Sequence, residues 1–406
     1  MSAVASRVAF PVARDGYEAA LDACVHTSWG QLAARFTSAI VHPSRAATPF
    51  QRGGWLQAWY DTVGAQVGTQ AVPLEIRDAD TGRPIFGVPL IKRVYEGQVV
   101  VEFADAGLTD YNAPLIGDGW AAGRQGDHSG GQNEGVVVTP DALLDLLREH
   151  LPDCDQLQFR KMPATLGGAA NPFAYLSGAR TSDVGTNVVT IDGSWSDYRA
   201  RLAKKVRKEL ERSFRVFQRD GTQARFQVVS DAVEAVAILE RMEVLQEERM
   251  RELQLPFILN EPQYSAFYRR LIELDLSNGR LLLTVLKSEP DEVVGALLGL
   301  VDGDSYAMVR LAHAGKAWSH CSPGKLMIDQ TMQHLHATGV TRFDFTTGDY
   351  SYKRGFLTES EPLVEVSLGL SLEGKLKLAR LSAVSEAKDQ MRRFPRAFEW
   401  LKRLVG

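Results

Sequence analysis

Apolar residues recur at helical spacing from Pro49 onward. In the run PFQRGGWLQAWYDTVG, Trp55, Trp59 and Val63 stand four apart, which predicts one buried face of a helix. Three apolar runs follow, and the Asp, Gly and Pro residues between the first two predict a hairpin. The predicted strands are LEIRD, IFGVPLIKRV and QVVVEFA. Residues 1–48 show no comparable pattern, and we treat them as an N-terminal extension.

The rest of the first half alternates loop, helix and strand. The stretch from Gly117 to Gly135 is polar and rich in glycine, which is typical of a surface loop. Thr139 and Pro140 predict the cap and the first turn of a helix, DALLDLLREHL. The run QLQFRKM after it predicts a further strand.

The second half begins with helices. Ser194 is expected to cap one long helix that ends at Gly221. Its predicted apolar stripe consists of Tyr198, Leu202, Val206, Leu210, Phe214 and Phe217. Two more helices follow, the second capped by Asn260 and stopped at Asn278–Gly279. After them come three strands, the helix LMIDQTMQHLHATG, the strands RFDFT and LVEVSLGLS, and a basic amphipathic helix.

The two halves repeat the same order of elements. Each shows a strand, a polar turn, a strand with a central glycine (Gly87 or Gly295), a strand, a loop, a helix and a strand. Antiparallel strands followed by a strand–helix–strand crossover predict α/β domains with mixed sheets. We therefore expect two tandem domains packed side by side, covering residues 49–185 and 186–406.

Composition limits the environment and the partners. The 406 residues, 45% apolar and 24% charged, are typical of a globular protein with two domains. A net charge of -4 gives no general attraction to nucleic acid, so no nucleic-acid partner is expected. No run approaches the roughly 20 apolar residues of a membrane span. Cys24, Cys154 and Cys321 predict reduced thiols in a cytoplasmic protein, while composition also allows a peripheral place at the inner membrane.

The junction of a loop and a helix near Ser322 is the first candidate site. Ser322 is expected to cap the helix, Pro323 to fix its first turn, and Gly324 to let a ligand approach the backbone. The backbone N–H groups at the start of a helix can bind phosphate, and Lys325 adds a positive charge there. The candidate cofactor-binding segment therefore runs from Ser322 to Leu326. A cofactor with a pyrophosphate group fits this pattern, and a plain capped helix fits it equally well.

Residues 311–356 resemble a known family. The runs SPGKL, RFDFTTGDY and YKRGF match the pattern of the CelD-type, BioF2-like acetyltransferases of the GNAT superfamily, which are related to the Fem-type peptidyltransferases. Residues 49–59 resemble the opening helix of that family, Thr109–Tyr111 its loop, and Lys204–Lys208 its basic helix. These matches occur in the same order as in the family.

The resemblance implies two tandem GNAT-like folds and an N-acyltransferase. It implies acyl-CoA, such as acetyl-CoA, as a co-substrate with no permanently bound cofactor, and an amine acceptor from polysaccharide or envelope synthesis. The chain departs from the superfamily in one place, because HCSPGKL at residues 320–326 stands where the pattern Q/R-x-x-G-x-G/A is usual. The phosphate contacts therefore need not follow the superfamily pattern.

Acyl transfer to an amine needs a base, a polarised thioester and a proton for the departing thiolate. Asp349 is the candidate base, Tyr352 the candidate proton donor, and Lys353 a candidate for binding a substrate anion. Asp344 and His313 are the next catalytic candidates. The structural alternative is that Asp344 and Lys353 form an ion pair and the tyrosines pack.

Two groups are candidates for binding the acceptor. One is a basic run on a helix, Lys204, Lys205, Arg207 and Lys208. These residues are all positively charged, so they are suited to bind an anionic acceptor in the cleft between the halves. Such an acceptor could be linked to a sugar nucleotide or to a lipid. The alternative is that the run is simply the solvated face of a helix. Asp110 and Tyr111 are expected either to face the same cleft or to fix a turn.

The remaining polar residues predict no further site. His334 and His336 are two apart on a helix and cannot chelate one ion together, so we predict no metal site. Cys321 is expected to pack rather than to act as a nucleophile. Two other functions are compatible with the sequence. One is a Fem-like transferase that uses charged tRNA, and the other is a non-catalytic scaffold of a polysaccharide-synthesis system.

Overall fold

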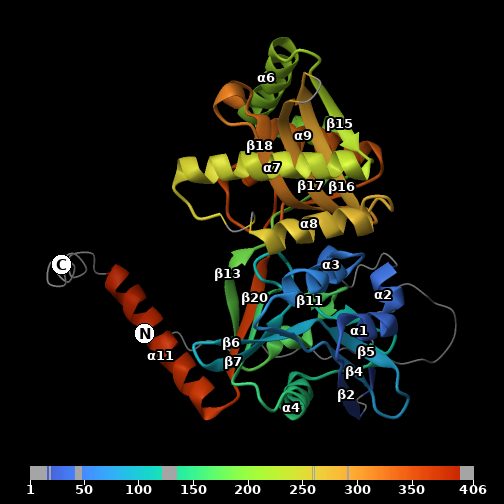
Figure 1. The fold of residues 1–406 in the computed structure, drawn as a ribbon, viewed down its shortest axis with the longest axis vertical. Coiled ribbons are helices and arrows are strands. Elements are labelled where there is room, and N and C mark those ends of the chain that lie inside the picture. Colours follow the sequence, from blue (N-terminus) through green and yellow to red (C-terminus); the bar gives the residue numbers. More distant parts are fainter. Residues whose placement is uncertain are drawn as a thin grey trace.

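The computed structural model describes residues 16–17, 20–41, 48–120, 135–257, 259, 261–289 and 292–393. Figure 1 shows two α/β halves along the longest axis, the first in blue to green and the second mostly in yellow to orange. Each half contains a six-stranded sheet with parallel and antiparallel pairs, which confirms the predicted mixed α/β class. Within these ranges, every helix is too short or too polar to cross a membrane.

Two sheets form the first half. The larger has the order β13 (Ala179–Gly185), β20 (Pro362–Gly369), β10 (Gln156–Met162), β7 (Gln98–Phe103), β6 (Leu90–Tyr95) and β3 (Thr69–Ala71). The smaller has the order β2 (Leu21–Val25), β4 (Leu74–Asp78), β5 (Pro84–Val88) and β8 (Leu115–Ile116). Two short pairs join β1 (Gly16–Tyr17) to β9 (Gly135–Val136) and β11 (Thr165–Leu166) to β12 (Ala169–Ala170). The hairpin predicted after Leu74 is confirmed, because β4 pairs antiparallel with β5. The single predicted strand IFGVPLIKRV is wrong, because the chain passes from the smaller sheet to the larger one at Pro89 and forms β5 and β6.

Residues before Thr48 complete the first half. β2 pairs antiparallel with β4, and the short helices α1 (Trp29–Arg35) and α2 (Thr37–Val41) follow it. Trp29 and Leu32 of α1 are buried in the same core as Trp59. The described part of the expected extension is therefore part of the first half. It was missed because its elements are too short for a periodic signal.

The predicted helix near Trp55 and the capped helix at Thr139 are both present. A 3-10 turn, η1 (Pro49–Gln51), precedes α3 (Trp55–Asp61), and η2 (Val63–Ala65) follows it. Trp55, Trp59 and Val63 are all buried, as their spacing predicts. α4 (Pro140–His150) starts at Thr139, whose hydroxyl accepts a hydrogen bond from the Ala142 N–H. Residues 121–134 of the loop predicted from Gly117 to Gly135, and the predicted cap at Asn260, lie outside the described residues.

The second half is built around one twisted sheet with helices on both faces. Its order is β14 (Val188–Thr190), β19 (Arg342–Asp344), β18 (Ser305–His313), β17 (Glu292–Asp302), β16 (Leu281–Ser288) and β15 (Arg225–Val229). Its helices are α5 (Trp195–Arg201), α6 (Lys204–Asp220), α7 (Ala232–Leu253), α8 (Pro262–Asp275), α9 (Pro323–Ala337) and α10 (Ser351–Arg354). Residues of α6 and α9 share one core cluster, while those of α7 and α8 share another with α3 of the first half. The ring of Trp55 meets that of Phe267 at 4.8 Å in this shared core.

The single long helix predicted from Ser194 is wrong, because the chain forms α5 and α6 with a break between them. Leu202 and Ala203 are extended there, with ψ angles of 144° and 138°. A stripe with residues four apart rotates by about 40° per step around a helix, so it cannot stay on one face for long. Phe214 accordingly points outward and is 42% exposed, while Ser213 and Val216 are buried in its place.

The strand β20 crosses the expected division of the chain at residue 185. It pairs antiparallel with β10 and with β13, so it completes the sheet of the first half. The chain then continues into α11 (Leu372–Arg393), which extends away from the body in Figure 1. The division into units stays a prediction, and the two halves interlock through β20.

Candidate active site

A loop of the first half, residues 105–112, reaches toward the second half. Asp105 holds it in shape, because its carboxylate accepts hydrogen bonds from the Gly107 and Thr109 N–H groups and pairs with Lys161 at 2.8 Å. The indole N–H groups of Trp55 and Trp59 donate to the Thr109 hydroxyl and the Asp105 carbonyl, each at 3.1 Å. The opening helix thus fixes the loop that carries Asp110 and Tyr111.

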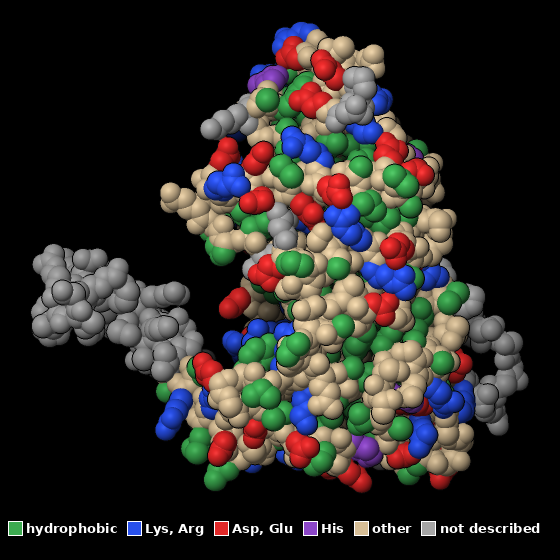
Figure 2. Space-filling model, viewed as in Figure 1, with side chains coloured by type: hydrophobic (Ala, Val, Ile, Leu, Met, Phe, Trp, Pro, Cys, Tyr) green, Lys and Arg blue, Asp and Glu red, His purple; other side chains and the backbone are tan. Residues whose placement is uncertain are grey.

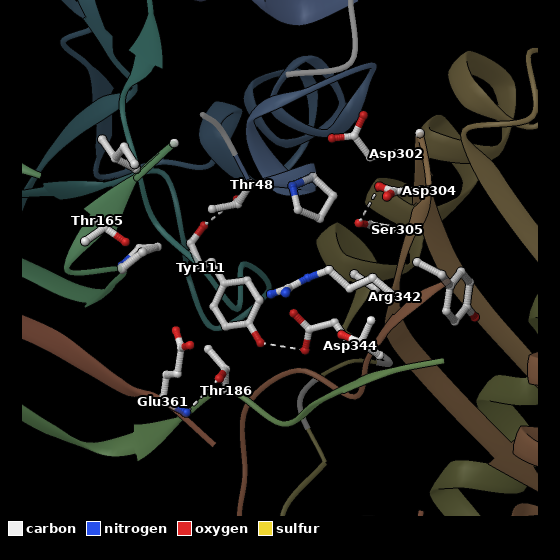
Figure 3. Close-up of a pocket in the computed structure, with 18 of the residues that line it drawn as sticks. Thr48, Tyr111, Thr165, Thr186, Asp302, Asp304, Ser305, Arg342, Asp344 and Glu361 are labelled. Carbon is white, nitrogen blue, oxygen red and sulfur yellow. Dashed lines mark hydrogen bonds between the residues drawn. The ribbon is translucent and has the colours of Figure 1, made fainter. Parts of the chain in front are cut away.

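Asp110 and Tyr111 both contact the second half. The Tyr111 hydroxyl donates a hydrogen bond to Oδ1 of Asp344 at 2.8 Å (Figure 3). The Thr347 hydroxyl donates to Oδ1 of Asp110. Three residues that the sequence proposed separately, Asp110, Tyr111 and Asp344, therefore meet at one place between the halves.

Lys353 lies behind this contact, and its surroundings do not support the predicted binding of a substrate anion. Its side chain is 2% exposed, and its ammonium donates to the carbonyls of Phe345 at 2.7 Å, Thr346 at 3.2 Å and Thr347 at 2.6 Å. Those three bonds hold a turn in which Thr346 has a φ of 57°. The expected ion pair of Asp344 with Lys353 is also wrong, because Asp344 is bound by Tyr111 and by the Thr346 N–H instead.

Burial shifts the acidity of this cluster. It raises the pKa of Asp344 to about 6, although the bonds from Tyr111 and Thr346 and the charge of Arg342 act in the opposite direction. It also raises the pKa of Asp110 and, together with the charge of Asp344, that of Tyr111. Burial lowers the pKa of Lys353 to about 8. A carboxylate that titrates near pH 6 is suited to accept a proton at neutral pH.

A cavity of about 670 Å³ opens beside the Tyr111–Asp344 bond (Figure 3). Thr48, Pro49 and the β11–β12 turn form its wall on the first half, and residues 302–307 with Arg342 and Asp344 form the opposite wall. A second cavity of about 450 Å³ adjoins it and shares Thr186, Thr190, Arg342 and Glu361 with it. Figure 2 shows the surface hollowed between the two halves, with charged side chains at the edge.

The predicted donor junction is present but differs in detail. α9 starts at Pro323, directly after a 3-10 helix, η5 (Lys316–Cys321). Ser322 does not cap it with its side chain, because the residue is left-handed, with a φ of 47°, and ends η5. Lys325 forms an ion pair with Glu209 of α6 at 2.6 Å, so the carboxylate partly neutralises the charge of the lysine. Gly324 packs on the ring of His313, where an added Cβ would lie 2.9 Å from Cδ2.

The edge of β18 between these two places has no strand partner in the described structure, although the Met308 and Leu311 carbonyls accept hydrogen bonds from the side chains of Thr346 and Gln246. β18 pairs in parallel with β19 only from Ser305 to Ala307, and the last pair is Ala307 with Asp344. A bulge at Val309 shifts the register of β18 against β17. From residue 308, β18 continues for six residues, or about 20 Å, to His313, which lies beside Gly324. Asp344 thus stands where the two strands part.

Asp349 and Tyr352 are not brought to the cavity. The Asp349 side chain is 79% exposed and pairs with Arg354 at 3.4 Å. Tyr352 is half-buried, and its ring stacks on Tyr350. α10 begins only at Ser351, so Asp349 lies before the helical turn. Their assignment as base and acid stays a prediction that the geometry does not support.

The basic run of α6 begins three residues after Arg201, which lines the second cavity. None of Lys204, Lys205, Arg207 and Lys208 lines either cavity. The next turns of α6 contact the donor junction instead, through the Glu209–Lys325 pair and through a hydrogen bond from Arg212 to the His320 carbonyl at 3.3 Å. The expectation that this charge faces the cleft between the halves therefore stays a prediction, which the lining of the two cavities does not support. Cys321 is buried, and burial raises its pKa to about 11, as a packing residue requires.

Comparisons with known proteins agree with this architecture. The model of the acetyltransferase (GNAT) domain matches residues 204–354, which is less than half of the chain. Among solved structures, FemX is similar with a TM-score of 0.55 at 12% identity, over 86% of this chain and 97% of that one. L-PGS from Bacillus licheniformis gives 0.49 at 13% identity (87% and 96%), and a tandem GNAT protein from the clavulanic acid biosynthesis pathway gives 0.44 at 12% (87% and 99%). The comparison with curated proteins found no match.

The match to the acetyltransferase (GNAT) domain model thus lies within the second half of the chain and supports a GNAT-type fold there. At such low identities the likeness to solved structures concerns the fold alone. Sequence reasoning missed Arg342 and Glu361 in the cavity wall. Arg342 could have been found from its place two residues before Asp344, because side chains two apart on a strand share a face.

Proposed function

We propose that the protein is an N-acyltransferase that moves an acyl group from acyl-CoA to an amine held in the larger cavity. The observation that carries the proposal is the Tyr111–Asp344 bond in the wall of that cavity, with the pKa of Asp344 raised to about 6. Both bonds to Asp344 end on Oδ1. Oδ2 is then the oxygen that receives the proton lost by the amine as the new N–C bond forms.

The donor would lie along the edge of β18 beyond Ala307. The backbone N–H groups at the start of α9, around Gly324, would hold its phosphates, assisted by Lys325. Arg212 of α6 lies beside that junction and supports the same placement, because its positive charge attracts phosphate groups. An extended arm that pairs with that strand edge would bring the thioester to the point where β18 and β19 part, next to Asp344.

In this proposal Asp344 takes the role that the sequence suggested for Asp349. The test is a transfer assay that follows thiol release from acetyl-CoA with a panel of amines, in the wild type, Asp344→Asn and Asp349→Asn. We expect Asp344→Asn to lower kcat by roughly a hundredfold or more, the scale of a lost general base, and Asp349→Asn to stay near the wild type. A loss confined to Asp349→Asn would place the base on the exposed turn instead.

The wider context also belongs to the proposal. The family resemblance supports an acceptor from polysaccharide or envelope synthesis and a cytoplasmic site of action, in the absence of an apolar helix that could span a membrane within the described ranges. A second candidate is Fem-type transfer from charged tRNA, which the fold similarity to FemX favours. Binding of aminoacyl-tRNA, with no binding of acyl-CoA in calorimetry, would select that alternative.

A further inference from the structure

Arg342 and Asp344 place opposite charges side by side in the cavity wall. They are two apart on β19, so their side chains leave one face of the strand about 6.6 Å apart. Both line the larger cavity, and Figure 3 shows Arg342 extending into it beside the Tyr111–Asp344 bond. A ligand at this wall meets both a cation and a carboxylate.

The two charges remain available to a ligand. Oδ1 of Asp344 is taken by Tyr111 and by the Thr346 N–H, and no ion pair joins Asp344 to Arg342. Arg342 is exposed, and none of the described residues forms an ion pair with it. Arg342 also lines the second cavity, so it lies where the two cavities adjoin. A guanidinium so placed is suited to hold a carboxylate or a phosphate.

The rest of the wall is acidic. Besides Asp302, which pairs with Arg52 at 3.0 Å, the two cavities are lined by five carboxylates and two guanidiniums. These are Asp192, Asp304, Asp344, Glu359 and Glu361, against Arg201 and Arg342. Such a wall attracts cations and repels a ligand with several negative charges. It does not suit an acceptor linked to a nucleotide diphosphate.

We propose that the acceptor is a small zwitterion that carries a primary amine and one carboxylate or phosphate group. Asp344 receives the amine, and Arg342 holds the anionic group. This inference rests on the proposed function only in naming the bound molecule as the acceptor. Arg342 is then the residue that selects acceptors, while the donor site lies along β18.

Calorimetry on the full chain without an acyl donor tests the binding. The probes are two zwitterions, each compared with a matched amine that lacks the anionic group. Alanine is compared with ethylamine, and phosphoethanolamine is compared with ethanolamine. We expect the wild type to bind at least one zwitterion at least tenfold more tightly than its matched amine. The zwitterion with the larger difference in affinity shows whether the site prefers a carboxylate or a phosphate group. Arg342→Gln should abolish that difference, and Arg148→Gln on α4, whose side chain is 52% exposed, should keep it.

Equal affinity for zwitterion and matched amine in the wild type overturns the inference, and so does discrimination that survives in Arg342→Gln. The inference and the proposed function fail separately. Zwitterion binding that depends on Arg342, without any acyl transfer, would refute only the enzymatic proposal. Acyl transfer to a zwitterionic acceptor, with an unchanged Michaelis constant for that acceptor in Arg342→Gln, would refute only the inference.

Discussion

At the scale of single residues, the environment of each polar group decides its role more than its type does. Lys353 and Asp349 stand four apart in one family-like stretch, yet Lys353 is 2% exposed and the Asp349 side chain is 79% exposed. The three carbonyls that Lys353 binds belong to the turn after β19. That turn supplies the Thr346 N–H to Asp344 and the Thr347 hydroxyl to Asp110. Lys353 therefore shapes the site from behind.

Lys353→Met should destabilise the protein, because it leaves three buried carbonyl groups without their donor. We expect the free energy of unfolding in urea to fall by roughly 2–4 kcal/mol. Lys377→Met is the matched control, since Lys377 pairs at 2.7 Å with Glu96, whose side chain is 83% exposed, and its loss should change the free energy by about 0.5 kcal/mol or less. Unchanged stability in Lys353→Met, with a raised Michaelis constant for the acceptor, would return this lysine to substrate binding.

Residue types and motifs predicted part of the site. Asp110, Tyr111 and Asp344 were candidates from the sequence, and the structure brings them together. Sequence could not show that Tyr111 and Asp344, which lie 233 positions apart, share a hydrogen bond. It also could not rank Asp344 above Asp349, because the two differ in burial, and so short a strand followed by a loop gives no pattern that shows which carboxylate is buried.

At the scale of elements, periodic patterns predicted the long helices and strands, and they failed where elements are short or interrupted. The run from Ser194 has an apolar residue at nearly every fourth position, and only the extended backbone at Leu202 and Ala203 reveals two helices. The short strand β2 and helix α1 gave no signal. The alternation in β20 predicted a strand but not its place, because sheet order depends on contacts between distant segments.

The position of α6 leads to a prediction about the donor. Replacing Lys204, Lys205, Arg207 and Lys208 by Gln should raise the Michaelis constant for acyl-CoA about tenfold at low salt, because partly exposed charge pairs contribute roughly 0.3–1 kcal/mol each. The constant for the acceptor should not change, since these residues line neither cavity. The effect should vanish near 1 M salt, where the Debye length is about 3 Å.

The matched control for α6 removes charges of the same sign from α7. Arg249 and Arg251 are partly exposed and pair only with glutamates of the same helix in the described structure. Arg249→Gln with Arg251→Gln should leave both Michaelis constants unchanged. A rise in the acceptor constant alone in the α6 variant would restore the original expectation that this helix recruits the acceptor.

At the scale of the whole molecule, the candidate active site is formed where the two halves meet. Trp55 packs on Phe267 in a shared core, β20 joins the first sheet, and the loop with Tyr111 reaches Asp344. The pKa of the proposed base is therefore set partly by a hydroxyl from the other half. This is the central claim of the account, and it concerns a single hydrogen bond.

The pH dependence of kcat/KM in the wild type and Tyr111→Phe tests that claim most directly. In the wild type, kcat/KM should fall as the pH drops through about 6, because Asp344 takes up a proton and can no longer act as a base. The Tyr111 hydroxyl favours the carboxylate, so its removal should raise the pKa of Asp344 and move this limb upward by roughly one unit. Circular dichroism would confirm that the variant is folded. Acid limbs at the same pH in both proteins would contradict the account.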